Sequence, residues 1–168
     1  GAVMVNDVSG LTHDPRSAAV VAEAGCAVVL MHMRGTPRSM SSLTDYADVA
    51  LDVHDELAAR LAAALRAGIA RERIVLDPGI GFAKTAEQNL VLLRRLALFR
   101  SFGRPLLVGV SRKGFIGRIA DEPEPKRRLG GSLAAGLVAA INGASILRVH
   151  DVAETVQALK VWRAIGTA

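Results

Sequence analysis

The stretch Ile74–Phe82 reads IVLDPGIGF, a short apolar run that ends in a carboxylate and continues into a glycine-rich turn. The run Ile74–Asp77 is typical of a strand that is buried on both faces. Asp77 could simply cap a tight turn. A carboxylate at the end of a buried strand is costly, however, unless another group pairs with it. We therefore expect Asp77 to bind a ligand that presents N–H donors, such as a guanidine-like edge.

Four further apolar runs have the same character, and helical periodicity separates them. The five predicted strands are Val3–Asn6, Ala27–Met33, Ile74–Asp77, Leu106–Val110 and Ile146–Val149. The predicted helices are residues 15–24, with Asp14 as N-cap, and then Thr44–Ala67, Thr85–Phe99, Leu129–Asn142 and Asp151–Ile165. Strands and helices that alternate in this way form parallel sheets with helical crossovers. The alternation fits either an open doubly wound sheet or part of a barrel.

The position of the polar residues favours the barrel. Each predicted strand ends in polar or glycine-rich residues: Asn6-Asp7, Met31–Gly35, Asp77–Gly79, Gly109–Lys113 and Arg148–Asp151. An open sheet needs such residues on two or three strands, whereas a barrel brings all strand ends to one mouth. The sequence thus predicts an α/β fold, a partial (β/α)8 TIM barrel of five β/α units with parallel strands, in one domain over residues 1–168.

The composition excludes several classes of protein. Of the 168 residues, 51% are apolar and 22% are charged, which excludes a disordered chain. No apolar run approaches the ~20 residues of a membrane span, so we expect no membrane association. Cys26 is the single cysteine, which fits a reducing compartment, and we expect a cytoplasmic protein.

The charge balance points to a small anionic ligand rather than to nucleic acid. The chain carries 21 lysines and arginines against 16 acidic residues, a net charge of +5. The basic residues are scattered and only 4% of the chain is aromatic, which is unlike a nucleic-acid-binding surface. A small anionic substrate accounts for a few arginines in a site equally well.

Two familiar motifs are approached but not met. The segment Gly79–Thr85 lacks the final glycine of the dinucleotide fingerprint, and Ala83 stands where a phosphate-binding loop needs glycine before Lys84. The segment Gly109–Lys113 lacks the second glycine of a nucleophile elbow, so a serine hydrolase using Ser111, His150 and Asp77 is disfavoured. Arg112 and Lys113 could belong to a solvated loop, but their place at a strand end favours ligand contact.

The end of the last predicted strand has the chemistry of an anion site. Arg148 and His150 are two residues apart, so their side chains point to the same face of a strand. A guanidinium is a planar donor suited to phosphate, and the N-terminus of the helix after Asp151, its expected N-cap, also favours an anion. Arg148 could instead pair with a carboxylate inside the barrel. No cluster of His, Cys and carboxylates at zinc spacing is present in the sequence.

Taken together, these motifs resemble the dihydropteroate synthase family. The matching blocks, in that family's order and spacing, are Val5–Gly10, Met31–Pro37, Asp77–Thr85, Gly109–Gly117, Arg128–Ala135 and Arg148–Thr155. The resemblance implies a (β/α)8 barrel that joins 6-hydroxymethyl-7,8-dihydropterin pyrophosphate to p-aminobenzoate and releases 7,8-dihydropteroate and pyrophosphate. It also implies competition by sulfonamides at the p-aminobenzoate site.

The resemblance assigns a role to each candidate residue. Asn6 and Asp77 would hold the pterin, Met31, Phe82 and Gly109 would shape its slot, and Lys113 would bond the pterin ring near p-aminobenzoate. Ser111 would face the p-aminobenzoate carboxylate, and Arg148 and His150 would hold the pyrophosphate. Lys113, Arg148 and His150 are the residues expected to act in catalysis. Such a transfer needs no nucleophile from the protein, which agrees with the broken elbow.

The sequence departs from the family in the number of strands. Its five strands match strands four to eight of the family's barrel, so we expect a preceding segment and two exposed sheet edges. The family's Mg²⁺ is implied as a cofactor, but its asparagine ligand falls in the missing part, and no metal ligand is assigned in this chain. Two alternatives to this enzyme are a non-catalytic pterin-binding module of the methyltransferase type and a partial chain that completes a barrel with a partner. The resemblance and the apolar residues of the last two helices predict a homodimer.

Overall fold

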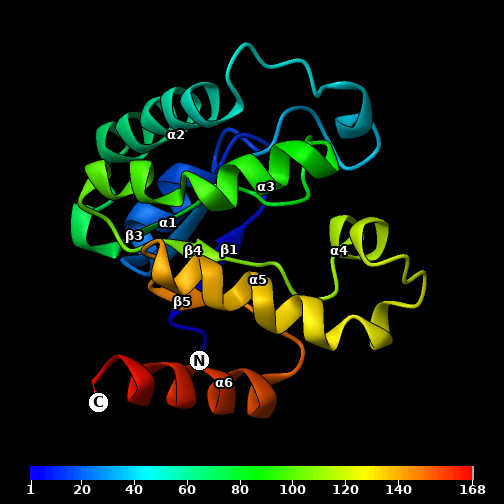
Figure 1. Cartoon of the computed structure of the whole chain (residues 1–168). Helices are drawn as coiled ribbons and strands as arrows, with labels where there is room; N and C mark the ends of the chain where they lie inside the picture. Colours follow the sequence, from blue (N-terminus) through cyan, green and yellow to red (C-terminus); the bar gives the residue numbers. More distant parts are fainter. Residues whose placement is uncertain (168) are drawn as a thin grey trace.

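The computed structural model describes residues 1–167 and contains five parallel strands in sequence order (Figure 1). Strands β1 (Met4–Asp7), β2 (Ala27–Met31) and β3 (Ile74–Asp77) form one sheet, and β4 (Leu107–Val108) pairs with β5 (Ile146–Leu147). A parallel bridge between Leu76 and Leu106 joins the two parts. The strand order is therefore β1-β2-β3-β4-β5, as a barrel segment requires.

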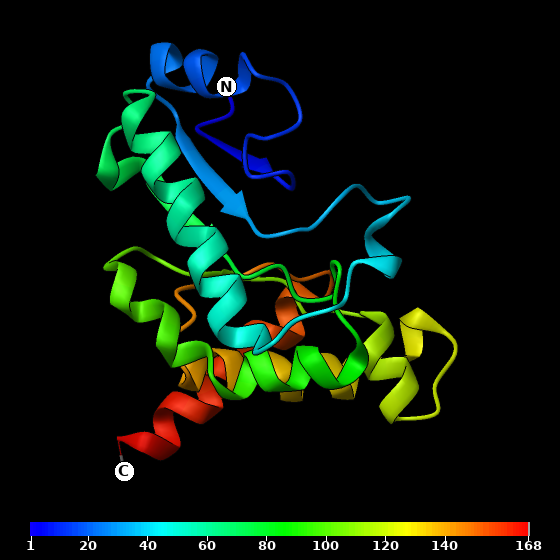
Figure 2. The ribbon, with the colours of Figure 1, turned by 90° about the horizontal axis from the view of Figure 1, so that it is seen from above.

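Six helices accompany the strands. They are α1 (Ser17–Ala24), α2 (Val49–Arg66), α3 (Ala86–Arg94), α4 (Gly114–Ile119), α5 (Leu129–Ile141) and α6 (Val152–Gly166). Short 3-10 turns lie at Met40–Ser42, Arg71–Arg73, Leu96–Phe102 and Pro125–Arg127. Figure 2 shows α2 running alongside β2, and α2, α3 and α5 pack against one another in that order.

The two faces of the sheet bury two separate sets of side chains. Val28, Leu30, Ile74, Leu76 and Val108 point toward the helices and are fully buried there. The alternate residues Val29, Val75 and Leu107, with Ile146, pack together on the opposite face, which is the interior of the barrel segment. The strand parity thus separates a helix-covered core from an inner layer that lies below the mouth.

The first strand differs from the prediction of strands buried on both faces. Val3, Met4 and Val5 are exposed, at 81%, 38% and 42% of their full surface. Within the described residues β1 pairs only with β2, and β5 only with β4, so each leaves an unpaired edge. The two exposed edges were expected.

The helix boundaries differ from the prediction where capping or turn chemistry competes with periodicity. The helix expected from Thr44 begins at Val49, because the side chain of Asp48 accepts hydrogen bonds from the amides of Ala50 and Leu51. Asp14 does not cap a helix at Pro15; it accepts from the Arg16 amide in a turn, and α1 begins at Ser17. The helix predicted over Thr85–Phe99 does begin there, because Thr85 is the N-cap of α3 and forms a capping box with Gln88.

Candidate active site

The inner layer of the sheet leads directly to the predicted site. Residues two positions beyond an inward-facing residue share its face, so Met31, Asp77, Gly109 and Arg148 lie above Val29, Val75, Leu107 and Ile146. Met31 and Asp77 are register partners on neighbouring strands. A Cβ on Gly109 would lie 3.8 Å from the Cβ of Arg148, so these strand ends are in contact.

Asp77 is the buried anion of this layer. It is 6% exposed, and its Oδ1 accepts a hydrogen bond of 2.7 Å from the Gly79 amide. Burial raises the pKa of Asp77 to about 6, although the Gly79 bond and the charges of Lys113, Lys84 and Arg148 oppose that rise. Three cations therefore act on this single carboxylate.

Lys113 links the carboxylate to the turn that follows it. Its Nζ donates to the carbonyl of Ile80 and lies 4.6 Å from the centroid of the Phe82 ring. Burial lowers the pKa of Lys113 to about 8. The negative charge of Asp77 opposes this decrease, and the positive charge of Arg148 adds to it. The side chain thus sits between the expected pterin slot and the expected anion site.

A cavity of about 500 Å³ opens at the carboxyl ends of β4 and β5. Its lining includes five of the predicted site residues, namely Gly109, Ser111, Lys113, Arg148 and His150. Arg148 and His150 follow β5 rather than lie in it, because the strand ends at Leu147, and both are largely exposed. Asp77 does not line this cavity, whereas Lys113 lines it and also acts on the charge of Asp77, so Lys113 relates the two.

His150 is held by a neighbouring strand end. Its backbone amide donates to Ser111 Oγ at 3.2 Å, and its Nδ1 lies 3.0 Å from the same oxygen. Ser111 is buried, so the hydroxyl fixes the imidazole from below. Because one hydroxyl also carries a donor hydrogen, Ser111 can still serve an anion in the cavity.

The Arg112–Asp151 ion pair corrects the prediction that Asp151 caps α6, while Arg112 also lines the cavity. The guanidinium of Arg112 donates to both carboxylate oxygens of Asp151, at 3.0 Å for Nε and Oδ2, so Arg112 is engaged within the protein. Arg112 lowers the pKa of Asp151 below its usual range. Asp151 stands at the N-cap position of α6, but its side chain makes no capping bond, because both of its oxygens accept from Arg112.

Two of the predicted residues lie at the rim of this arrangement. Asn6 is exposed on the edge strand β1, in register with Val29, so it shares the inner face. Phe82 is half-buried beneath Lys113. The structure therefore brings Asp77, Phe82 and Lys113 together, whereas Asn6 stands two strands away from Asp77.

The sequence analysis missed a buried network on the helix side of β2. His32 is fully buried, with Nε2 2.9 Å from Glu56 Oε2 and Nδ1 2.9 Å from Lys84 Nζ. Burial, together with Lys84, Arg60 and Arg34, lowers the pKa of His32 to about 2, so the ring is neutral. The sequence did contain a hint of this network. His32 follows Met31 directly, so its side chain points to the opposite, helix-covered face of the sheet.

The described residues hold no group of three or more His, Cys, Asp or Glu side chains that could bind a metal ion. No described helix is both long and apolar enough to cross a membrane.

The mouth of parallel strands, with a buried carboxylate beside cations, agrees with the comparisons with known proteins. A family model described as "Pterin binding enzyme" matches residues 1–150. The chain belongs to the pterin binding enzymes. The match covers the first five strands and stops just before α6.

Among pterin binding enzymes, several similar proteins carry the name dihydropteroate synthase. The chain is 49% identical to the dihydropteroate synthase of Synechocystis sp. over 167 residues, and 46% identical to that of Escherichia coli K12 over 168 residues. These alignments cover 97% and 100% of this chain but 58% and 59% of the relatives. The chain thus spans about three fifths of the length of the curated relatives it matches.

A solved pterin binding enzyme shows the same arrangement of strands and helices. The crystal structure of dihydropteroate synthase from Stenotrophomonas maltophilia superposes with a TM-score of 0.95 at 44% identity, covering 99% of this chain and 62% of that chain. The prediction of a partial TIM barrel from this family is confirmed by that likeness.

Proposed function

We propose that the protein is a dihydropteroate synthase of folate synthesis. It would join 6-hydroxymethyl-7,8-dihydropterin pyrophosphate to p-aminobenzoate and release 7,8-dihydropteroate and pyrophosphate. The observation that carries the proposal is the buried Asp77, coupled through Lys113 to a cavity lined by Arg148 and His150. A carboxylate for N–H donors beside cations for a diphosphate is the chemistry that this reaction needs.

Named relatives support the choice of ligands. The dihydropteroate synthase of Thermus thermophilus, 45% identical with a TM-score of 0.92, has been solved in complex with 6HMPPP and with 4-aminobenzoate. That of Xanthomonas albilineans has been solved in complex with 7,8-dihydropteroate. Substrates and a product of the proposed reaction are thus bound by proteins of this family.

Asp77 and Asn6 would recognise the pterin. The ionised carboxylate of Asp77 accepts from the ligand's amino and ring N–H groups, and the buried setting makes an unpaired donor there costly. Met31, Phe82 and Gly109 would form the walls of the slot. Gly109 suits this place because it adds no side chain beside Arg148.

Lys113, Arg148 and His150 would serve the leaving group. The amine nitrogen of p-aminobenzoate forms a bond to the pterin's exocyclic methylene carbon while the bond from that carbon to the diphosphate oxygen breaks. The departing diphosphate gains negative charge, which the cations stabilise, and the amine loses a proton. Ser111, while holding His150, would donate its hydroxyl hydrogen to the p-aminobenzoate carboxylate.

Magnesium is the family's expected cofactor. Mg²⁺ is usually bound by one or two protein groups together with substrate phosphates. No group of three or more possible ligands exists among residues 1–167, so an Mg²⁺ ion here would be held largely by the substrate diphosphate. We assign this chain's own diphosphate contacts to Arg148 and His150.

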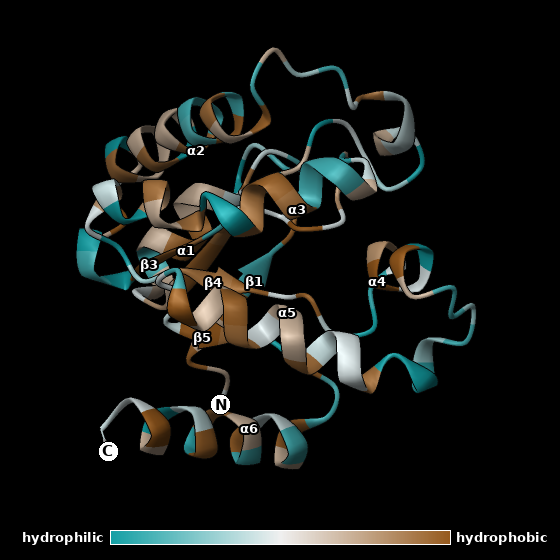
Figure 3. Cartoon of the chain, in the orientation of Figure 1, coloured by the Kyte–Doolittle hydropathy of each residue, from teal (hydrophilic) through white to brown (hydrophobic). Residues whose placement is uncertain are grey.

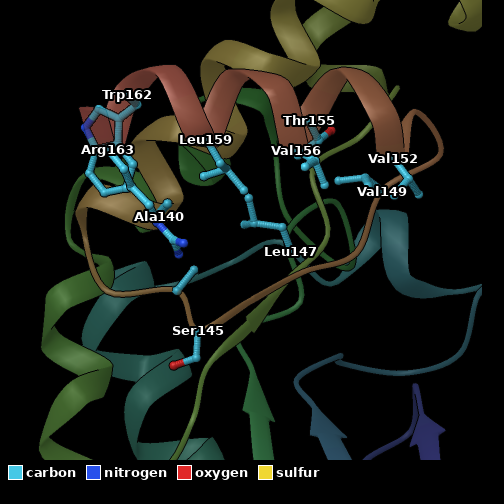
Figure 4. A pocket seen from close by; sticks show the side chains of 11 residues that line it. Ala140, Ser145, Leu147, Val149, Val152, Thr155, Val156, Leu159, Trp162 and Arg163 are labelled. Atoms are coloured by element: carbon cyan, nitrogen blue, oxygen red, sulfur yellow. The ribbon is translucent and has the colours of Figure 1, made fainter. Parts of the chain in front are cut away.

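The proposed dimer would use the last two helices. Figure 4 shows Leu159 and Trp162 pointing from α6 into a groove of about 460 Å³ that Leu147 and Val149 also line. The apolar stripe on α6 is therefore partly used within the chain. Large apolar residues of α5 and α6 remain exposed, namely Val138, Ile141, Val152, Val156, Val161 and Ile165. Figure 3 shows apolar residues along both helices. We infer a homodimer in a cytoplasmic enzyme, and light scattering of the full chain at tens of micromolar tests the dimer.

Lys113→Met provides the test of the function. We expect the full chain, supplied with both substrates and Mg²⁺, to release pyrophosphate, and we expect Lys113→Met to lower that rate roughly 100-fold or more. Lys160→Met, on the exposed side of α6, is the matched control and should keep the rate. Binding of pterin without pyrophosphate release would instead identify a pterin-binding module.

A further inference from the structure

Side chains outside the turn after β3 bond its backbone, in addition to the hydrogen bonds that the turn makes within itself. We define it as the Asp77–Ala83 turn. Four side chains from other segments bond its backbone, namely Lys84 to the carbonyls of Gly79 and Phe82, Lys113 to that of Ile80, Tyr46 to that of Ala83, and Asn89 to the amide of Gly81. Since the turn carries Asp77 and Phe82, these supports set the shape of the proposed pterin slot.

Lys84 bonds two backbone carbonyls of the Asp77–Ala83 turn and the imidazole of His32. Its Nζ lies 3.1 Å from Gly79 O, 2.8 Å from Phe82 O and 2.9 Å from His32 Nδ1. An ammonium has three N–H donors, and here each finds one acceptor. Because Nε2 of His32 faces the Glu56 carboxylate, Nε2 carries the ring hydrogen and Nδ1 is an acceptor. A neutral amine has only two N–H donors, so it would leave one of these three acceptors unpaired. The geometry therefore requires a protonated Lys84.

His32 connects this ammonium to a carboxylate. With Nδ1 accepting from Lys84, Nε2 carries the hydrogen and donates to Glu56 Oε2 at 2.9 Å. Arg34 holds the other oxygen of Glu56, at 2.8 Å from Nε. Glu56 thus polarises the neutral His32 ring, and the ring nitrogen Nδ1 in turn accepts from the half-buried ammonium of Lys84.

We propose that Lys84 is a positioning residue for the pterin slot, held protonated by Glu56 through His32, and that it fixes Asp77 and Phe82 by clasping the Asp77–Ala83 turn. The inference rests on the proposed function, because pterin is the ligand whose binding reports on the slot. Lys84 touches no part of the anion cavity at Arg148 and His150. Its effect is therefore expected on the pterin side alone.

The electrostatics agree with this role. Burial lowers the pKa of Lys84 to about 7, and the charges that face it are Asp77 and Glu56, which raise the pKa, and Lys113 and Arg60, which lower it. Protonation of Lys84 thus depends on its acidic neighbours near neutral pH. Loss of the Glu56 charge should release the clasp at a lower pH.

Lys84→Met tests the clasp directly, since it keeps the length and apolar stem but removes the three donors. We expect the affinity for 6-hydroxymethylpterin, measured by calorimetry at pH 6.5, to fall roughly 10- to 100-fold. Pyrophosphate affinity should stay within about twofold of the original value, since Lys84 lies outside that cavity. Lys160→Met is the matched control and should bind pterin as the unmodified chain does.

Glu56→Gln tests the relay with less risk to folding, because Glu56 is partly exposed. Pterin affinity should decline with rising pH as Lys84 loses its proton, and the midpoint of this decline should move down by about half a pH unit in Glu56→Gln. Asp77 and Lys113 titrate in both proteins, so the difference between the two profiles isolates the relay. A purely structural role of Glu56 would leave the midpoint in place.

The outcomes separate the two proposals. No pterin binding by the unmodified chain would overturn the proposed function. Pterin binding that is equal in the unmodified chain and in Lys84→Met would overturn the clasp while the function stands. If Lys84→Met fails to fold, an unshifted profile in Glu56→Gln overturns the clasp instead.

Discussion

Gly79 lies so close to His32 that a Cβ built on it would be 1.9 Å from the His32 carbonyl oxygen. Gly79 also has a φ of +70°, in the left-handed region that glycine adopts at no steric cost. This contact brings the Asp77–Ala83 turn onto the end of β2, and the His32 amide donates to the Asp77 carbonyl at 2.9 Å. The turn and the strand end therefore behave as one packed unit.

Gly79→Ala should destabilise the protein by at least about 3 kcal/mol, because the added methyl group meets backbone as well as a left-handed conformation. Denaturant unfolding measures this change. Gly25→Ala is the matched control: it has a φ of +59° but no atom within 4 Å of the added Cβ. Gly25→Ala should lower the free energy of unfolding by only about 1 kcal/mol, the cost of placing alanine in the left-handed conformation. Equal losses in the two variants would contradict the close approach.

Asp77→Asn should weaken pterin binding by roughly 2–4 kcal/mol, because an amide donor replaces an acceptor against the ligand's N–H groups. Calorimetry with 6-hydroxymethylpterin at pH 8, where Asp77 is ionised, gives the comparison. Pterin binding by the unmodified protein should also weaken as pH falls below about 6, the pKa of Asp77. Unchanged affinity in the variant would remove Asp77 from the pterin site.

The same substitution should stabilise the free protein at alkaline pH. The folded pKa of about 6 lies above the ordinary value of 3.8, so the stability that protonated Asp77 contributes is present below pH 3.8 and is lost as the pH rises through 6. Asparagine imitates the protonated acid, so Asp77→Asn should raise the free energy of unfolding at pH 8 by roughly 1–3 kcal/mol. The gain should vanish near pH 4. A loss of stability at pH 8 would show that the cations more than offset the burial of the charge.

His32→Gln should change the acid dependence of stability. The folded pKa of about 2 lies below the ordinary 6.5, so the stability due to neutral His32 is present above pH 6.5 and is lost as the pH falls toward 2. Between pH 5.5 and 4, the unmodified protein should lose up to about 1.4 kcal/mol per pH unit more than the variant. Urea titrations at several pH values measure both slopes. His13→Gln, at an exposed site, should keep the original slope.

Arg148→Ala should weaken pyrophosphate binding by roughly 2–3 kcal/mol, as the loss of a charge-assisted contact would, and should affect free pterin less. Calorimetry with pyrophosphate and with 6-hydroxymethylpterin separates the two effects. Arg66→Ala, exposed at the end of α2, controls for the change in net charge. Equal weakening by both variants would indicate a general electrostatic effect instead of a site.

The parallel strands could be predicted because their signals are local. The four residues Ile74–Asp77 are enough to predict a strand, and β3 spans the same four residues. Helix α4 was not predicted, since Gly114–Ile119 is one short helix with two glycines and too few residues for a periodic pattern.

The Glu56–His32–Lys84 network and the Arg112–Asp151 pair depend on contacts between distant segments. Lys84 is 52 positions from His32, and Arg112 is 39 positions from Asp151. At Asp151 the local rule predicted an N-cap, but a guanidinium from another strand end outcompetes the backbone amides for its oxygens. Such pairings require the fold, since no spacing in the sequence marks them.

The external support of the Asp77–Ala83 turn has a consequence for how this mouth can change over generations. The bonds that hold the turn end on its backbone atoms, and Lys113 also contacts the Phe82 ring. A substitution at Phe82 therefore alters the wall that a ligand meets, while Lys84 and Tyr46 still hold the path of the chain. The architecture thereby lets the wall of the slot change by single substitutions at Phe82 without removing the residues that brace the turn from outside.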